Sequence, residues 1–138
     1  MRVLVLGGYG LLGLAISKSL LDQNIQVVGL ARSAEKGRKF LPGATWISAD
    51  ISKLTRPEDW QEHLINIDAV INAAGILQDG FKDKVVATQR DSIIAVIKAC
   101  EKTGIKKFIQ ISAPGAQVTS NTAFYKTKAE ADQFLKRS

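Results

Sequence analysis

The stretch that decides the fold is Val3–Ser17, VLVLGGYGLLGLAIS, in which an apolar run of strand length leads directly into a glycine-rich turn and a helical pattern. Its glycines fit two spacings, Gly7-x-x-Gly10-x-x-Gly13 and Gly8-x-Gly10-x-x-Gly13. One glycine permits a tight strand-to-helix turn, another lets backbone N–H groups approach a ligand, and a third lets the helix pack on the strand. Because the loop lacks the GK[ST] ending of a mononucleotide P-loop, we predict that it cradles the pyrophosphate of a dinucleotide at the helix amino terminus.

Outward from this loop, apolar runs of strand length alternate with segments of helical period, which is typical of βαβ units and a parallel sheet. The 138 residues, 46% of them hydrophobic, suffice for one domain, residues 1–138, with a sizeable core. We expect strands at Arg2–Leu6, Gln26–Ala31, Thr45–Ala49, Asp68–Ala73 and Lys107–Ile111. We expect helices at Gly10–Asp22, at Ala34–Phe40, from Pro57 after Thr55, at Asp83–Thr103 ended by Gly104, and from near Thr122.

Right-handed crossovers between these strands predict the order 3-2-1-4-5, a Rossmann-type doubly wound α/β sheet. The sequence ends directly after a helix, at Ser138, where such a fold normally supplies a sixth strand. We therefore expect a truncated amino-terminal part of a larger fold, whose missing part carries most substrate contacts. A self-sufficient domain of five strands is the alternative.

Composition excludes several functional classes. The net charge of +6 comes from dispersed Lys and Arg with no basic stripe between aromatic residues, so we expect a solvated surface and no nucleic-acid partner. With one Cys, Cys100, and one His, His63, no metal cluster can form at the usual spacings, and Cys100 falls at a buried helical position. No stretch has transmembrane length, and Lys18 and the glycines interrupt any export signal. We expect a cytoplasmic domain without metal or membrane insertion.

The residue after the second predicted strand points to the type of dinucleotide. Proteins that bind NAD usually have Asp or Glu there, to accept hydrogen bonds from the ribose 2′-hydroxyl. This chain has Arg32 followed by Ser33, a pair that suits a 2′-phosphate through charge-assisted hydrogen bonds. We therefore predict NADP, with NAD as the alternative if Arg32 is an ordinary exposed cation near the adenine. Asp50 and Ile51 follow the third strand and are expected to flank the adenine, unless Asp50 only caps a turn.

In order along the chain come the glycine loop, Arg32, Asp50-Ile51, Asn72-Ala73-Ala74-Gly75, Ser112 and the run Tyr125-Lys126-Thr127-Lys128-Ala129-Glu130. With these motifs the chain resembles the short-chain dehydrogenase/reductase superfamily over nearly its whole length. The Gly7-x-x-Gly10-x-x-Gly13 spacing and the run NAAGILQDG are similar to its extended and atypical branches, including the group of a respiratory complex I accessory subunit. From the residues we predict cofactor contacts at Gly7, Gly8, Tyr9, Gly10, Leu11, Leu12, Gly13, Arg32, Ser33, Asp50 and Ile51, and the resemblance implies further contacts at Ala73, Ala74, Gly75 and Lys128.

Active members of this superfamily use an Asn-Ser-Tyr-Lys set, with Tyr four residues before Lys on one helix face. If Lys128 is that lysine, Phe124 occupies the tyrosine position and cannot transfer a proton. Tyr125 lies three residues before Lys128, about 100° round the helix from the required position. The resemblance implies a substrate-polarising role for Ser112, while Gln89 replaces the helix Asn. Ser112, Tyr125 and Lys128 are thus the catalytic candidates of a degenerate site.

Three functional hypotheses remain open. The first is a nucleotide-binding protein without dehydrogenase chemistry, acting as a cofactor carrier, redox sensor or assembly factor. The second is an NADP-dependent oxidoreductase or an epimerase/dehydratase-like enzyme that acts on an unidentified small molecule. The third is flavin or quinone reduction by NAD(P)H, which needs hydride delivery but no tyrosine. The helix expected at Asp83–Thr103 packs between subunits in many relatives, so an oligomer is possible; the alternative is that this apolar helix only covers its own sheet.

Overall fold

The computed structural model describes residues 1–74, 90–111 and 123–137, and within the last range it describes side chains from residue 130 onward. In this part of the chain five strands form one parallel sheet in the order β3-β2-β1-β4-β5, which confirms the predicted topology. The strands are β1 (Arg2–Leu6), β2 (Gln26–Ala31), β3 (Thr45–Ser48), β4 (Ala69–Asn72) and β5 (Lys107–Gln110).

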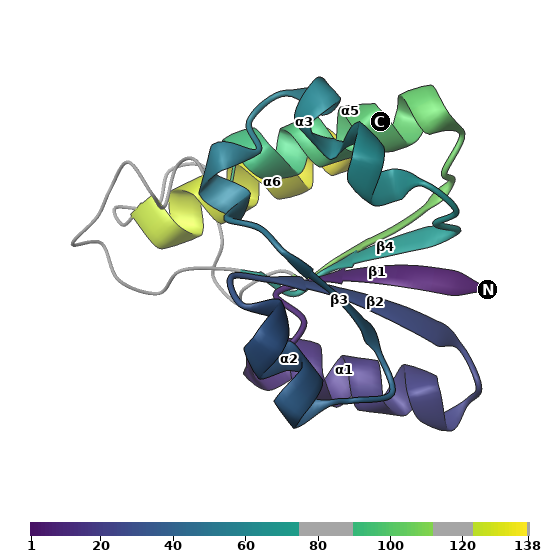
Figure 1. The fold of residues 1–138 in the computed structure, drawn as a ribbon. Coiled ribbons are helices and arrows are strands. Elements are labelled where there is room, and N and C mark those ends of the chain that lie inside the picture. The colour runs from purple at the N-terminus through teal and green to yellow at the C-terminus, as the bar shows by residue number, and fades with distance from the viewer. Residues whose placement is uncertain (75–89, 112–122, 138) are drawn as a thin grey trace.

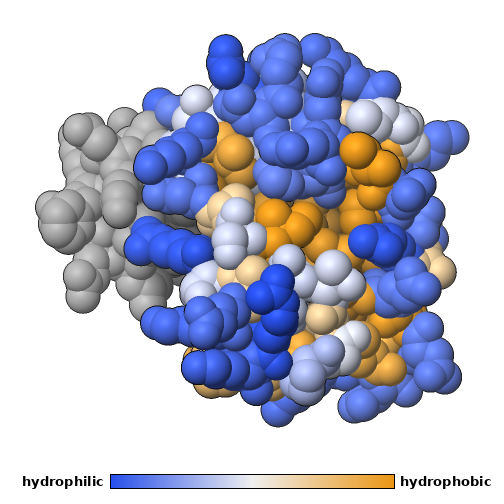
Figure 2. Space-filling view, in the orientation of Figure 1, coloured by the Kyte–Doolittle hydropathy of each residue, from blue (hydrophilic) through white to orange (hydrophobic). Residues whose placement is uncertain are grey.

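Helices cover both faces of this sheet (Figure 1). They are α1 (Leu11–Asp22), α2 (Ala34–Phe40), α3 (Pro57–Trp60), α5 (Ser92–Thr103) and α6 (Ala123–Arg137), with short 3₁₀ helices η1 (Ile51–Lys53) and η2 (Gln61–Leu64). One face carries α1 and α2, and the other carries α3, α5 and α6 (Figure 1). In the same orientation, Figure 2 shows hydrophilic residues over both helical layers and hydrophobic surface in the band between them.

The central strand β1 is buried on both faces because its side chains alternate between two hydrophobic clusters. Leu4 and Leu6 pack into the cluster that includes residues of α5, and Val3 and Val5 into the cluster that α1 covers. Burial of each such side chain contributes roughly 1.5–3 kcal/mol. A parallel strand that is covered on both faces has a continuous apolar run, and this explains the VLVL that precedes the glycine loop.

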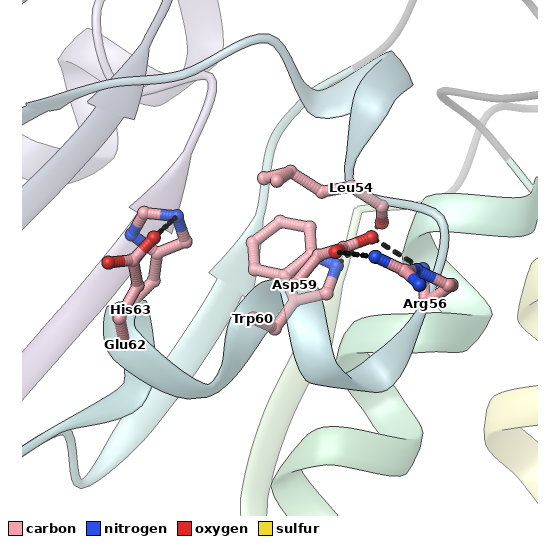
Figure 3. A network of polar contacts seen from close by, with 6 residues as sticks. All are labelled: Leu54, Arg56, Asp59, Trp60, Glu62 and His63. Atoms are coloured by element: carbon pink, nitrogen blue, oxygen red, sulfur yellow. Dashed lines mark hydrogen bonds and ion pairs between the residues drawn. The ribbon is translucent and has the colours of Figure 1, made fainter.

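A polar network fixes the segment between β3 and β4 (Figure 3). Asp59 accepts hydrogen bonds from the backbone N–H and the guanidinium of Arg56, both at 3.1 Å, so the pKa of its carboxyl lies below the usual value. The Nε1 of the fully buried Trp60 donates to the Leu54 carbonyl at 2.8 Å. The helix predicted to begin at Pro57 is confirmed, and Arg56 is its N-cap, since Arg56 and Asp59 form the capping interaction.

Other element boundaries differ from the predictions by about one residue. Strands β3, β4 and β5 end at Ser48, Asn72 and Gln110, although the next residue in each case still donates a hydrogen bond to the neighbouring strand. The predicted helix over 83–103 is described only from residue 90, and its end is confirmed by Gly104, which adopts φ +79°. Cys100 on that helix is buried as predicted, and burial raises the pKa of its thiol to about 12.

Candidate functional site

A cavity of about 280 Å³ lies at the carboxyl ends of β1, β2, β3 and β4. The chain leaves β1 toward β2 on one side and returns to β4 on the other, so this is the switch point of the sheet, where α/β proteins bind ligands. The cavity is lined by Gly7, Tyr9, Gly10, Leu30, Ala31, Arg32, Ala49, Asp50, Ile51, Ala73 and Ala74. Most of these residues were predicted from the sequence, while Leu30, Ala31 and Ala49 were missed.

The glycines of the loop have different reasons to lack a side chain. Gly7 adopts φ +72°, and a Cβ there would lie 3.0 Å from the Cα of Ala74. A Cβ on Gly13 would overlap the carbonyl of Gly7, so the third glycine lets α1 approach the loop. A Cβ on Gly10 would meet only the Gly7 oxygen, at an ordinary 3.4 Å. Packing within the described chain therefore requires glycine at positions 7 and 13 but leaves room at position 10, on the cavity.

The amino end of α1 is suited to an anion. Its N-cap is Gly10, which offers no capping side chain, and its first turn contains no acidic residue. The N–H groups of the first turn have no acceptor within a helix and carry the positive end of its dipole. Leu11 is 91% exposed and Leu12 is 53% exposed, and neither lines the cavity.

Gly8 does not line the cavity and instead packs against an aromatic side chain that was not predicted from the sequence. A Cβ on Gly8 would lie 2.8 Å from the indole of Trp46, which projects from β3. Tyr9, the next residue, lines the cavity and has its ring centroid 5.9 Å from that of Trp46. Of the two glycine spacings that the sequence allows, the one that begins at Gly7 is the one that faces the cavity.

Arg32 follows β2 directly and lines the cavity with an exposed side chain. Within residues 1–74, 90–111 and 123–137, no acidic side chain forms an ion pair with it. Ser33, beside it, is the N-cap of α2, and its Oγ accepts the N–H of Lys36 at 3.2 Å. A hydroxyl that accepts one hydrogen bond can still donate its own hydrogen to another group.

Asp50 and Ile51 also line the cavity, at the end of β3. The Oδ1 of Asp50 accepts hydrogen bonds from the backbone N–H of Ser52 at 3.0 Å and from its hydroxyl at 2.6 Å. Asp50 is therefore the N-cap of η1, as the alternative interpretation of this residue anticipated. These two bonds hold its Oδ1 against the start of η1.

A buried amide connects the cavity to β5. Asn72 is fully buried, its Nδ2 donates to Gln110 at 2.9 Å, and its Oδ1 accepts the N–H of Ala74 at 3.0 Å. Because Ala74 lies against Gly7, this pair of bonds fixes the wall of the cavity that faces the glycine loop. The segment that begins at Asn72 was predicted from the sequence, but its partner on β5 was not.

The predicted catalytic residues lie at the edge of what the structure describes. Ser112 lies outside the described residues, as does Gly75 among the predicted cofactor contacts. Phe124, Tyr125 and Lys128 lie within the backbone of α6, in the part whose side chains are not described. Just beyond them, Glu130 pairs with the guanidinium of Arg90 at 2.8 Å. Arg90 is half-buried, and its contacts with Glu130 and with Asp91 raise its pKa. The contact with Glu130 also joins α6 to the start of α5.

Residues 7–138 match the model of a protein family described as NAD(P)H-binding. A Synechocystis protein named photosystem II assembly factor Ycf39 is 41% identical over 116 residues, which cover 81% of this chain and 33% of that protein. A Bacillus halodurans structure, provisionally named a NAD-dependent epimerase/dehydratase, is 29% identical and matches with a TM-score of 0.85, over all of this chain and 65% of its own. The Bordetella bronchiseptica enzyme WbmG, solved with NAD, matches at 0.84 with 22% identity, over the whole of this chain and 50% of its own, and shows the fold alone.

The chain thus spans a third of the length of its Synechocystis relative and up to two thirds of the solved structures' chains. None of the helices in the described ranges has both the length and the apolar character that a membrane crossing needs.

Proposed function

This chain belongs to the NAD(P)H-binding family, and we propose that it is the cofactor-binding part of an atypical short-chain dehydrogenase/reductase-like protein that prefers NADP and lacks the usual catalytic tyrosine. The observation that carries the proposal is the exposed guanidinium of Arg32 on the cavity wall, with no acidic partner in the described part of the chain.

The glycine loop and α1 suit the pyrophosphate. Gly7 and Gly13 have no side chain for reasons of packing, whereas the space at Gly10 is open and borders the cavity. A backbone without a side chain at this point allows an anion to approach the N–H groups of the first turn of α1. We therefore propose that the pyrophosphate binds beside Gly10, at the amino end of α1, where no side chain caps the helix.

Arg32 suits the 2′-phosphate of NADP. A guanidinium presents several N–H donors in a fixed plane, and its hydrogen bonds to phosphate are charge-assisted. The Ser33 hydroxyl lies beside it and can donate a further bond. Asp50 lines the same cavity, and we propose that its carboxylate flanks the adenine. A carboxylate at position 32 would repel the same phosphate. These features favour NADP over NAD as the ligand.

The degenerate catalytic site is proposed from the register of α6. The helix runs from Ala123 to Arg137, so Phe124 and Lys128 are separated by about one turn, as Tyr and Lys are in active members. The Lys128 ammonium can still bind the ribose hydroxyls, but Phe124 offers no transferable proton. The ion pair of Arg90 with Glu130 would hold this helix against α5. Ser112 and Tyr125 then remain as the groups that could restore proton transfer.

Calorimetric titration of the full-length protein with NADP and with NAD tests the cofactor preference. Loss of one charge-assisted hydrogen bond of about 1.5–3 kcal/mol means that Arg32→Ala should weaken NADP binding by about ten-fold or more and leave NAD binding unchanged. Arg38→Ala is the matched control, since Arg38 is an exposed arginine on α2 that does not line the cavity. Equal losses for both dinucleotides, or none for NADP, would contradict the proposal.

A second candidate function is catalysis, favoured by the likeness to the Bacillus halodurans structure. In that case the full-length protein is an NAD(P)H-dependent oxidoreductase, an epimerase/dehydratase-like enzyme or a flavin or quinone reductase. Tyr125→Phe and Ser112→Ala separate these routes. Loss of turnover in either variant assigns proton transfer to that residue, whereas NADPH oxidation by a quinone that survives both changes favours direct hydride delivery.

The name of the Synechocystis relative supports a role in assembly rather than turnover. We propose that the bound dinucleotide then acts as a structural or redox-sensing ligand. Affinity purification of the full-length protein from its own cells, with and without added NADPH, tests this role. The assembly role predicts that intermediates of photosystem II co-purify and that Arg32→Ala alters their retention. Turnover without any such partner would favour the enzyme.

A further inference from the structure

The indole of Trp46 is packed among three glycines from three different segments. A Cβ on Gly8 in the glycine loop, on Gly29 in β2 or on Gly37 in α2 would lie less than 3.0 Å from a ring atom of Trp46. Trp46 is only 6% exposed, and its Nε1 donates to the Leu41 carbonyl at 3.0 Å. The ring therefore occupies a space that the three missing side chains leave open, and one hydrogen bond fixes its orientation.

The same ring supports the turn that carries Arg32. Trp46 forms a small buried cluster with Ala31 and Ala34, the residues that flank the Arg32-Ser33 pair. Two residues further along β3, the Ser48 hydroxyl accepts the N–H of Ala34 at 2.7 Å. Both ends of the turn are thus held by β3, through a hydrophobic contact at Trp46 and a hydrogen bond at Ser48.

We propose that Trp46 is a positioning residue that fixes the glycine loop and the Arg32 turn relative to one another, so that one rigid side chain sets the distance between the sites for the pyrophosphate and for the 2′-phosphate of the ligand. The inference rests on the proposed function of the cavity. Trp46 does not line the cavity, so it acts through Gly8 and Tyr9 on one side and through Ala31 and Ala34 on the other. A planar ring in a close-packed interior transmits such a constraint because it has no room to shift.

The test compares Trp46→Phe with Trp60→Phe. Trp60 is a matched control because it is also buried, also donates its Nε1 to a leucine carbonyl, and is not a lining residue of the cavity. Both variants should lower the thermal unfolding temperature of the full-length protein. Only Trp46→Phe should also weaken NADP binding, by roughly ten-fold or more, since small displacements of binding groups carry penalties of this size. Equal dissociation constants for the two variants would overturn the inference.

A second pair of variants moves the ring without removing it. Gly37→Ala introduces a methyl group against the indole, whereas Gly43→Ala places its methyl 3.4 Å from Leu21, an ordinary contact. The new Cβ would overlap Cδ2 of Trp46, so the ring or α2 must shift, and we expect Gly37→Ala to lower the thermal unfolding temperature even though alanine favours the helix at position 37. We expect Gly37→Ala to weaken NADP binding and Gly43→Ala to leave it unchanged. Unchanged binding in Gly37→Ala would overturn the inference even if Trp46→Phe did not fold.

The ratio of NADP to NAD affinity separates this inference from the proposed cofactor preference. If both hold, Trp46→Phe lowers the ratio in the presence of Arg32 and leaves it unchanged in an Arg32→Ala background. If the unaltered protein binds NAD and NADP equally, the preference fails. The positioning role is then supported by a loss of affinity for both ligands in Trp46→Phe relative to Trp60→Phe, and overturned if there is no such loss.

Discussion

Replacement of Asn72 by alanine is expected to lower the free energy of unfolding, both because it removes two hydrogen bonds and because it leaves a small cavity. The side chain is fully buried and makes two hydrogen bonds, one to Gln110 and one from the Ala74 N–H. Alanine would leave both partners unpaired, at about 1–2 kcal/mol each, and would add a small cavity. The expected loss is therefore about 2–4 kcal/mol, out of a total stability of roughly 5–15 kcal/mol.

Urea and thermal unfolding followed by circular dichroism measure this loss. For a chain of this size, we expect the unfolding temperature to fall by about 10 °C. Gln110→Ala is the control, since it removes one of the two bonds and also removes an amide nitrogen that is buried without a partner in the described part of the chain. It should cost about 1 kcal/mol or less. An Asn72→Ala variant within about 0.5 kcal/mol of the unaltered protein, or a control that costs as much, would refute the reasoning.

Three further predictions concern single residues. Gly104→Ala should cost about 1–2 kcal/mol in urea unfolding, because position 104 has φ +79° and no atom near a new Cβ, so only backbone strain is added; an unchanged midpoint would contradict this. The Cys100 thiol, with its pKa raised to about 12, should react with a disulfide reagent at pH 8 only after urea is added, and prompt reaction in the native protein would show that it is not buried. Because the pKa of Asp59 is lowered in the folded state, Asp59→Asn should reduce stability at neutral pH, and the difference should disappear as the pH falls below 3.8; a difference that persisted in acid would indicate another cause.

The fold could be predicted because its determinants are local. Apolar runs, the glycines at 7, 10 and 13 and the helix end at Gly104 each specify a short piece of backbone, and the handedness of crossovers then restricts the order of the strands. Arg32 could be found in the same way, since its position after β2 follows from the strand itself. Leu30, Ala31 and Ala49 were missed because their side-chain types carry no chemistry, although their place at strand ends could have indicated them.

Long-range contacts account for what the sequence did not reveal. Nothing near Trp46 in the sequence indicates that it packs on Gly8, and nothing near Asn72 indicates its bond to Gln110, since these partners come together only when the sheet forms. For Asp50, two roles were compatible with the sequence, and the structure adds the capping bonds to Ser52 without excluding the contact to adenine. The roles proposed for Ser112, Tyr125 and Lys128 stay predictions.

The packing of Trp46 against Gly8 of the glycine loop also makes its fluorescence sensitive to a ligand in the cavity. Residues 1–138 contain two tryptophans, so a Trp60→Phe variant of this 138-residue chain emits from Trp46 alone. Indole emission overlaps the absorption band of reduced nicotinamide, and energy transfer between the two depends steeply on distance. The emission of this single indole would then report occupancy of the adjacent cavity without any attached dye. Ligand binding can thus be followed by the intrinsic fluorescence of Trp46, the residue that we propose positions the glycine loop and the Arg32 turn.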